Sequence, residues 1–151
     1  MHNLHMRVGL NVFSIGLLLS LSLSSWAQEL HDPQKAFQVS TDTRRPVLLV
    51  FSGSDWCAPC IRFEKTILSG EAFQAYAKDH LVILKADFPQ RKKLPKEEVA
   101  QNQALAEKYN PQGLFPHVVV LTSADASPLT LHFNDQTTDE FIAEINAALV
   151  K

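Results

Sequence analysis

Residues 47–60, VLLVFSGSDWCAPC, decide the fold of this chain. The first five form a continuous apolar and partly β-branched run before a polar loop, which is the pattern of a strand buried on both faces. After the loop, apolar residues keep helical spacing until a Ser-Gly pair at 69–70 ends the segment. The stretch therefore predicts a buried strand over 47–51 and a helix over 58–68, with two cysteines where the helix begins.

The chain on both sides of this stretch adds strands and helices in an order that predicts an α/β fold. Helix-start signals are the Asp32-Pro33 pair and a capping box made by Thr137 and Glu140. The other predicted strands are 81–87, 117–121 and 129–133, and the other predicted helices are 33–41, 71–78, 95–109 and 137–149. The strand-helix-strand order implies a parallel crossover, whereas the last two strands are joined by a turn and pair antiparallel. We therefore expect a mixed central β-sheet flanked by helices on both faces.

The first 27 residues differ in composition from the rest of the chain. The segment 8–23 contains no charged residue, a single basic side chain, Arg7, precedes it, and Ser25-Trp26-Ala27 fits a small-residue cleavage site. The pattern favours a signal peptide over 1–27, cleaved after Ala27, ahead of one domain over 28–151. A retained membrane anchor is the alternative, but polar residues dilute the apolar run below the ~20 apolar residues of a spanning helix.

Composition limits what the remaining domain binds. The 151-residue chain has 46% hydrophobic residues and a net charge of −2, and removal of the leader with Arg7 leaves 124 residues and a net charge of −3. This is enough chain for one hydrophobic core. The mild acidity favours neither a nucleic acid partner nor, once the leader is removed, a membrane surface.

The two cysteines, Cys57 and Cys60, predict redox chemistry more than structural support. A structural disulfide normally closes a long loop, whereas only Ala58 and Pro59 separate these two. At the start of a helix, unpaired N–H groups and the helix dipole favour the Cys57 thiolate, which makes Cys57 the expected nucleophile. Cys60 lies one turn further along and is the expected resolving thiol. Pro59, which has no N–H, fits the first helical turn.

Two other interpretations of the cysteine pair are open but disfavoured. A zinc site would need two more ligands, and the histidines after the leader are not spaced as a pair. They are His31, His80, His117 and His132. Inert core cysteines are the second alternative, and a helix start in an oxidising compartment argues against them. We expect no metal and no cofactor apart from a redox-active Cys57–Cys60 disulfide.

These residues together resemble the thioredoxin superfamily, in particular exported thioredoxin-like proteins with a Gly-Ser-Asp-Trp-Cys approach to the cysteines. The resemblance covers about 36–149 and rests on the strand 47–51, the motif Trp56-Cys57-Ala58-Pro59-Cys60, and Phe115-Pro116 before a strand. It implies the thioredoxin fold. It also implies that Pro116 is a cis-proline against the cysteines, and that the Phe115 backbone pairs with a substrate chain held at Cys57. Cis X–Pro bonds are otherwise uncommon, so the resemblance alone carries this expectation.

Two departures from the family pattern affect the chemistry. Thioredoxins usually have a buried aspartate six residues before the first cysteine, and Phe51 occupies that position here. The proton acceptor for Cys60 is therefore unassigned: Glu64 could act through water, although an exposed helix carboxylate is the favoured interpretation. Ala58 stands where glycine is common, and the connection over 88–109 is longer and more basic than usual, so the family's redox potential does not transfer.

Several residues near the motif carry weaker predictions. Trp56 either contacts substrate or covers the cysteines from solvent. Asp55 opposes the Cys57 thiolate slightly through water, and His117, first in its strand, is expected to point away from the cysteines. The basic cluster 91–93 is interpreted as a solvated loop more readily than as a docking site.

Together these features predict an exported thiol–disulfide oxidoreductase, with the bacterial periplasm as the expected compartment. It would reduce disulfides in exported proteins, oxidation being the disfavoured direction, and an unidentified electron-donor protein would re-reduce the Cys57–Cys60 pair. The alternative is a thioredoxin-fold binding module for a peptide or an assembly partner, with incidental redox activity. Phe51, in the place of the usual aspartate, motivates that alternative.

Overall fold

A computed structural model of the chain describes residues 27–150. The predicted leader therefore lies outside the described residues, apart from Ala27. The strands are β1 (Glu29–Leu30), β2 (Val47–Ser52), β3 (Val82–Asp87), β4 (His117–Leu121) and β5 (Leu129–Leu131). The helices are α1 (Pro33–Thr43), α2 (Ala58–Phe63), α3 (Glu71–His80), α4 (Lys96–Tyr109) and α5 (Thr138–Leu149), and a π-helical segment, η1 (Glu64–Leu68), continues α2.

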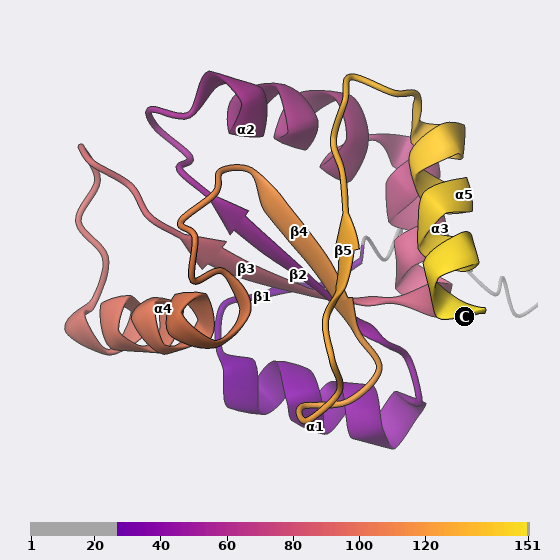
Figure 1. Cartoon of the computed structure of the whole chain (residues 1–151), viewed down its shortest axis with the longest axis horizontal. Coiled ribbons are helices and arrows are strands. Elements are labelled where there is room, and N and C mark those ends of the chain that lie inside the picture. Colours follow the sequence, from indigo (N-terminus) through magenta and orange to yellow (C-terminus); the bar gives the residue numbers. More distant parts are fainter. Residues whose placement is uncertain (1–26, 151) are drawn as a thin grey trace, which may run out of the picture.

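One mixed sheet, with strand order β1-β3-β2-β4-β5, forms the centre of the molecule (Figure 1). β1 and β2 run parallel to β3, whereas β4 runs antiparallel to both β2 and β5. Helices α2, α3 and α5 cover one face of the sheet, and α1 and α4 cover the other. The predicted fold class, a mixed sheet with helices on both faces, is confirmed.

The residues of β2 alternate between two hydrophobic cores, one on each face of the sheet. Leu48 and Val50 pack with α2, α3 and α5, whereas Val47, Leu49 and Phe51 pack with α1 and α4. All five are at most 2% exposed. A strand covered by helices on both sides needs apolar residues at every position, which explains the unbroken apolar run in the sequence.

Some element boundaries differ from the sequence predictions. The sequence pattern does not predict β1, because only one of its two residues is buried and so short a strand shows no periodicity. The helix predicted over 58–68 is α-helical only to Phe63, and the strand predicted to end at 133 ends at Leu131. Phe133 instead packs on Phe63, with ring centroids 4.8 Å apart. The cysteines still lie where α2 begins.

The two helix-start signals are confirmed. Asp32 accepts the backbone N–H groups of Gln34 and Lys35 at the start of α1, and Thr137 and Glu140 form a reciprocal capping box at the start of α5. Between residues 27 and 150, no helix combines the length and the apolar composition needed to span a membrane.

Candidate active site

Cys57 and Cys60 form a disulfide at the N-terminus of α2, with the sulfur atoms 2.11 Å apart and the Cα atoms 5.2 Å apart. Cys57 is the N-cap residue, and its sulfur accepts the backbone N–H of Cys60 at 3.3 Å. Ala58 and Pro59 form the exposed first turn between them. After reduction, the same N–H and the amino end of the helix stabilise a thiolate at Cys57. Both cysteines are nearly buried, with 4% and 3% exposure.

The peptide bond between Phe115 and Pro116 is cis, which is the geometry that the resemblance implies. Phe51 on β2 pairs with His117 on β4, so this bond lies beside the loop that leads from β2 to Cys57. The Phe115 ring meets the rings of Trp56 and Phe88 edge to face, each with centroids 5.5 Å apart. Three aromatic rings, from segments that are distant in sequence, therefore pack together next to the residues that precede Cys57.

Trp56 both covers this region and stays accessible, so the two interpretations that the sequence left open are compatible. Its indole N–H donates to the carbonyl oxygen of Phe88 at 2.7 Å, and 39% of the residue is exposed. A β-carbon at Gly53 would lie only 2.3 Å from the indole ring. Gly53 therefore leaves room for the indole ring of Trp56, which lies directly against the backbone of residue 53.

Asp87, at the end of β3, supports the same loop from inside the molecule. Its carboxylate accepts the backbone N–H of Ser54 at 2.9 Å, the Ser54 hydroxyl at 2.6 Å and the Ser52 hydroxyl at 3.4 Å. Asp87 is only 9% exposed, and its own carbonyl oxygen accepts the side-chain amide of Asn102 at 2.8 Å. A buried carboxylate requires such donors, so these contacts bind β3 to the segment that precedes Cys57.

Asp55 supports the loop from outside. Its carboxylate accepts the backbone N–H groups of Gln90 at 2.9 Å, Arg91 at 2.7 Å and Lys92 at 3.0 Å. The N–H of Gln90, followed by those of Lys92 and Arg91, lowers the pKa of Asp55 from its ordinary value of 3.8. The sequence predicted only a weak opposition to the Cys57 thiolate and did not predict this contact. The charged carboxylate of Asp55 accepts hydrogen bonds from the backbone of 90–92.

Glu64 lies on the surface of the helix, as expected, with 40% of its side chain exposed, but it has two partners. It accepts a hydrogen bond from the Ser69 hydroxyl at 2.7 Å and pairs with Lys85 at 2.7 Å, while Lys85 also pairs with Glu29 at 2.8 Å. Burial opposes the charge of Lys85, but the bonds to the two glutamates outweigh it and raise the pKa of Lys85 above 10.5. Because Lys85 comes from the middle of β3, this pairing depends on tertiary structure.

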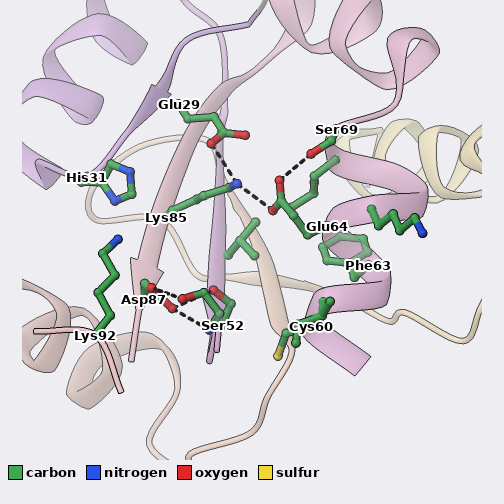
Figure 2. A pocket seen from close by; sticks show the side chains of 15 residues that line it. Glu29, His31, Ser52, Cys60, Phe63, Glu64, Ser69, Lys85, Asp87 and Lys92 are labelled. Carbon is green, nitrogen blue, oxygen red and sulfur yellow. Dashed lines mark hydrogen bonds and ion pairs between the residues drawn. The ribbon is translucent and has the colours of Figure 1, made fainter. Parts of the chain in front are cut away.

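Cys60 lines a cavity of about 500 Å³ together with Glu64, Lys85 and Asp87. Figure 2 shows Cys60, Glu64, Lys85 and Asp87 around it, with Ser52 beside Asp87. Phe51 is absent from this lining because its side chain faces the opposite core. The cavity thus contains carboxylates near Cys60 although the usual aspartate position is apolar.

Among the histidines of residues 27–150, His31 lines this cavity, whereas His80, His117 and His132 do not. The ring of His117 lies 5.8 Å from that of Phe51, and its Nε2 is 3.1 Å from the carbonyl oxygen of Tyr109. Burial lowers the pKa of His117 from 6.5. Over residues 27–150, no group of three or more His, Cys, Asp or Glu side chains is arranged to hold a metal ion.

A family model described as Thioredoxin-like matches residues 26–123, which is more than half of the chain. This chain belongs to the thioredoxin-like family. Disulfide bond reductase DsbH of Chlamydia pneumoniae is 30% identical over 115 residues, which cover 76% of this chain and 69% of that protein.

Solved structures agree with this assignment. A structure of DsbH oxidoreductase has a TM-score of 0.76 and 29% identity, and the match covers 83% of this chain and 86% of that one. A thioredoxin from Thermus thermophilus has a TM-score of 0.60 at 17% identity, covering 84% and 90%, and supports the fold alone. This thioredoxin-like protein therefore has the thioredoxin fold and is homologous to a disulfide oxidoreductase.

The main residues that sequence reasoning missed in this thioredoxin-like site are Asp87 and its serine partners. The signal was present, because 81–87 reads LVILKAD and a carboxylate that ends a buried strand needs hydrogen-bond donors. What the pattern could not supply is the register, in which Ser52 lies opposite Asp87.

Proposed function

We propose that this protein is an exported thiol–disulfide oxidoreductase that reduces disulfides in other exported proteins. The observation that carries the proposal is the Cys57–Cys60 disulfide at the start of α2, next to a loop bordered by the cis Phe115–Pro116 bond. The homology to a protein named a disulfide bond reductase supports the reducing direction. The structure corresponds to the oxidised state, which is the form that such a reductase has after one turnover.

In the reduced protein, the Cys57 thiolate attacks one sulfur of a substrate disulfide and releases the other substrate sulfur as a thiolate. Cys60, deprotonated, then attacks the sulfur of Cys57 in the mixed disulfide. This forms the Cys57–Cys60 disulfide and releases the second substrate thiol, so two electrons pass from the protein to the substrate. A partner dithiol protein returns the pair to the reduced state by the reverse exchange.

The positions of the two cysteines on α2 suit this sequence of steps. Both are nearly buried, at 4% and 3% exposure, but Cys57 is the N-cap residue, whereas Cys60 lies inside the first turn with its backbone N–H on the sulfur of Cys57. Glu29, Glu64 and Asp87 line the same cavity as Cys60, and of these carboxylates Glu64 and Asp87 are the ones that we propose accept its proton through water. The exposed Trp56 and the Phe115 backbone supply the surface on which a substrate chain would lie.

The proposal includes export. The leader pattern over 1–27 favours secretion and cleavage after Ala27, which leaves the domain 28–151 in an oxidising compartment such as the bacterial periplasm. Intact-mass measurement of the protein recovered from a periplasmic extract tests this, with a chain that begins at Gln28, as glutamine or as its cyclised pyroglutamate form, as the expected product. Recovery of the protein with Met1 intact in the membrane fraction contradicts it.

Substitution of each cysteine tests the reaction. Cys57→Ser should abolish the reduction of insulin, whereas Cys60→Ser should accumulate mixed disulfides that appear on non-reducing gels and vanish with dithiothreitol. A Cys57→Ser variant that reduces insulin at the rate of the unaltered protein contradicts the assignment of the nucleophile.

The binding-module alternative rested on Phe51, and the structure weakens that motive because Asp87 brings a buried carboxylate to the cavity of Cys60. A measured reduction potential of the Cys57–Cys60 couple separates the two functions. A potential within reach of cellular dithiol donors favours the reductase, and a couple that these donors cannot reduce favours the binding module.

A further inference from the structure

A cationic segment lies beside the redox centre. Residues 90–96, called the basic loop below, contain Arg91, Lys92, Lys93 and Lys96, and all four are exposed. Within the described part of the chain, none of the four forms an ion pair. Glu97 and Glu98 follow in α4, and Glu98 lies against His31 at 3.5 Å. Asp55, Glu97 and Glu98 offset part of the charge of these four side chains, so the basic loop carries a small local excess of positive charge in a chain with a net charge of −2.

The basic loop is held in place by the segment that leads to the nucleophile. Asp55 accepts three of its backbone N–H groups, and Trp56 binds the carbonyl oxygen of Phe88 just before it. Asp55 and Trp56 directly precede Cys57 in the sequence. A loop that is already ordered loses less conformational entropy on binding than a free one, so its charges are presented at low cost.

A groove lies between residues 87–94 and the first turns of α4, which begins with Lys96 of the basic loop. It has a volume of about 460 Å³. Its apolar lining is Phe88, Pro89, Leu94 and Val99, and its polar lining is Asp87, Lys92, Lys93, Lys96, Asn102 and Gln103. Val99 is 39% exposed, so its side chain is accessible to a partner. The Phe88 ring also packs on Phe115, which in turn packs on Trp56. The groove is therefore continuous with the surface around Cys57.

We propose that the basic loop and this groove dock an acidic segment with an apolar side chain, carried by the protein that exchanges a disulfide with Cys57. Carboxylates of the partner would meet Lys93 and Lys96, and its apolar side chain would enter the groove between Phe88 and Val99. The proposal rests on the proposed function for the disulfide step. A membrane surface is the disfavoured occupant, because a bilayer lying on this face would also cover the approach to Cys57.

Cysteine-free peptides test the docking separately from the chemistry. Two peptides of equal length, one with leucine flanked by glutamates and one with leucine flanked by lysines, are titrated into the oxidised full-length protein by calorimetry. The glutamate peptide should bind about tenfold more tightly at low ionic strength, and added salt should reduce this preference.

Matched charge reversals locate the site. Lys93→Glu with Lys96→Glu should lower the affinity for the glutamate peptide about tenfold, whereas Lys35→Glu with Lys78→Glu, on α1 and α3, changes the net charge equally and should have little effect. Equal losses in the two double variants, or equal binding of the two peptides, overturn the proposal. Binding to phosphatidylglycerol vesicles without binding of the glutamate peptide also overturns it and assigns the basic loop to a membrane.

Turnover supplies a second test. For a disulfide peptide with acidic flanks, kcat/KM should fall about tenfold in the Lys93→Glu, Lys96→Glu variant, while reduction of the uncharged 2-hydroxyethyl disulfide stays unchanged. A parallel fall with both substrates overturns the docking role and places the two lysines in the chemistry. If the unaltered protein reduces neither disulfide, the proposed function fails, and the peptide titration still decides the docking.

Discussion

Two aspartates support the approach to Cys57, one from inside the molecule and one from its surface. Asp87 reaches from the end of β3 to Ser52 and Ser54, whereas Asp55 reaches outward to the backbone of 90–92. Each carboxylate accepts three hydrogen bonds. Asp87 joins residues 52–54 to the sheet, and Asp55 joins the residues just before Cys57 to the basic loop. The redox centre and the proposed docking surface therefore have separate supports on one short segment.

Burial makes the two supports unequal. Asp87 is 9% exposed, so its carboxylate depends on protein donors and joins the sheet to Ser52 and to the exposed Ser54. Asp55 lies at the surface, where water can replace its carboxylate at Gln90, Arg91 and Lys92. The difference predicts that loss of the inner aspartate affects the whole fold, whereas loss of the outer one affects the basic loop alone.

The largest effect is expected from Asp87→Ala. It leaves the N–H and hydroxyl of Ser54 without their acceptor and should lower the free energy of unfolding by about 2–3 kcal/mol. Urea unfolding of the oxidised protein measures this. Asp87→Asn is the matched control, because its amide oxygen can still accept the Ser54 N–H, and it should cost about 1 kcal/mol. An Asp87→Ala variant as stable as the unaltered protein would remove the inner support from the comparison.

A smaller effect is expected from Gly53→Ala, which acts between the two supports. The added β-carbon would lie 2.3 Å from the indole of Trp56, so the ring must move and its bond to Phe88 must break. The stability should fall by about 1–2 kcal/mol. Nuclear magnetic resonance should show a displaced indole N–H signal for Trp56. Gly113→Ala is the contrasting case: a β-carbon there meets nothing within 4 Å but φ is +64°, so it should cost stability through backbone strain while the Trp56 signal stays in place.

Asp55→Asn should change the global stability less than Asp87→Asn. Its side chain keeps one acceptor oxygen but loses the charge, so the amide hydrogens of Gln90, Arg91 and Lys92 should exchange faster with solvent. Affinity for the glutamate peptide should fall about threefold, since the basic loop is less ordered. Unchanged exchange at all three amides would show that Asp55 does not hold this loop.

The smallest effect is a pH dependence of the outer support. The backbone N–H groups lower the pKa of Asp55, so its contribution is complete above the ordinary value of 3.8 and is lost as the pH falls through the folded value. Exchange at Gln90, Arg91 and Lys92, corrected for intrinsic rates, should be constant above the ordinary pKa of 3.8 and accelerate as the pH falls below it. Asp55→Asn should remove this step; acceleration that persists in that variant assigns the titration to another group.

Most of the fold follows from local patterns. The apolar run 47–51, the cysteine spacing and the capping residues each act within a few positions, so periodicity and residue type were enough to predict them. β1 did not follow, because two residues carry no period and the strand exists only through its pairing with β3. The ion pair of Glu64 did not follow either, because its partner, Lys85, is distant in sequence and meets it only in the folded chain.

The sequence by itself therefore determined most of the elements, the redox pair and the thioredoxin-like family, since these depend on residue type and short spacing. Only the tertiary structure decided what surrounds the pair. The register of β2 on β3 places Ser52 opposite Asp87, and the fold brings Asp55 to the backbone of 90–92. Hydrogen bonds and ion pairs between distant segments need a defined distance and direction, and a linear pattern contains neither.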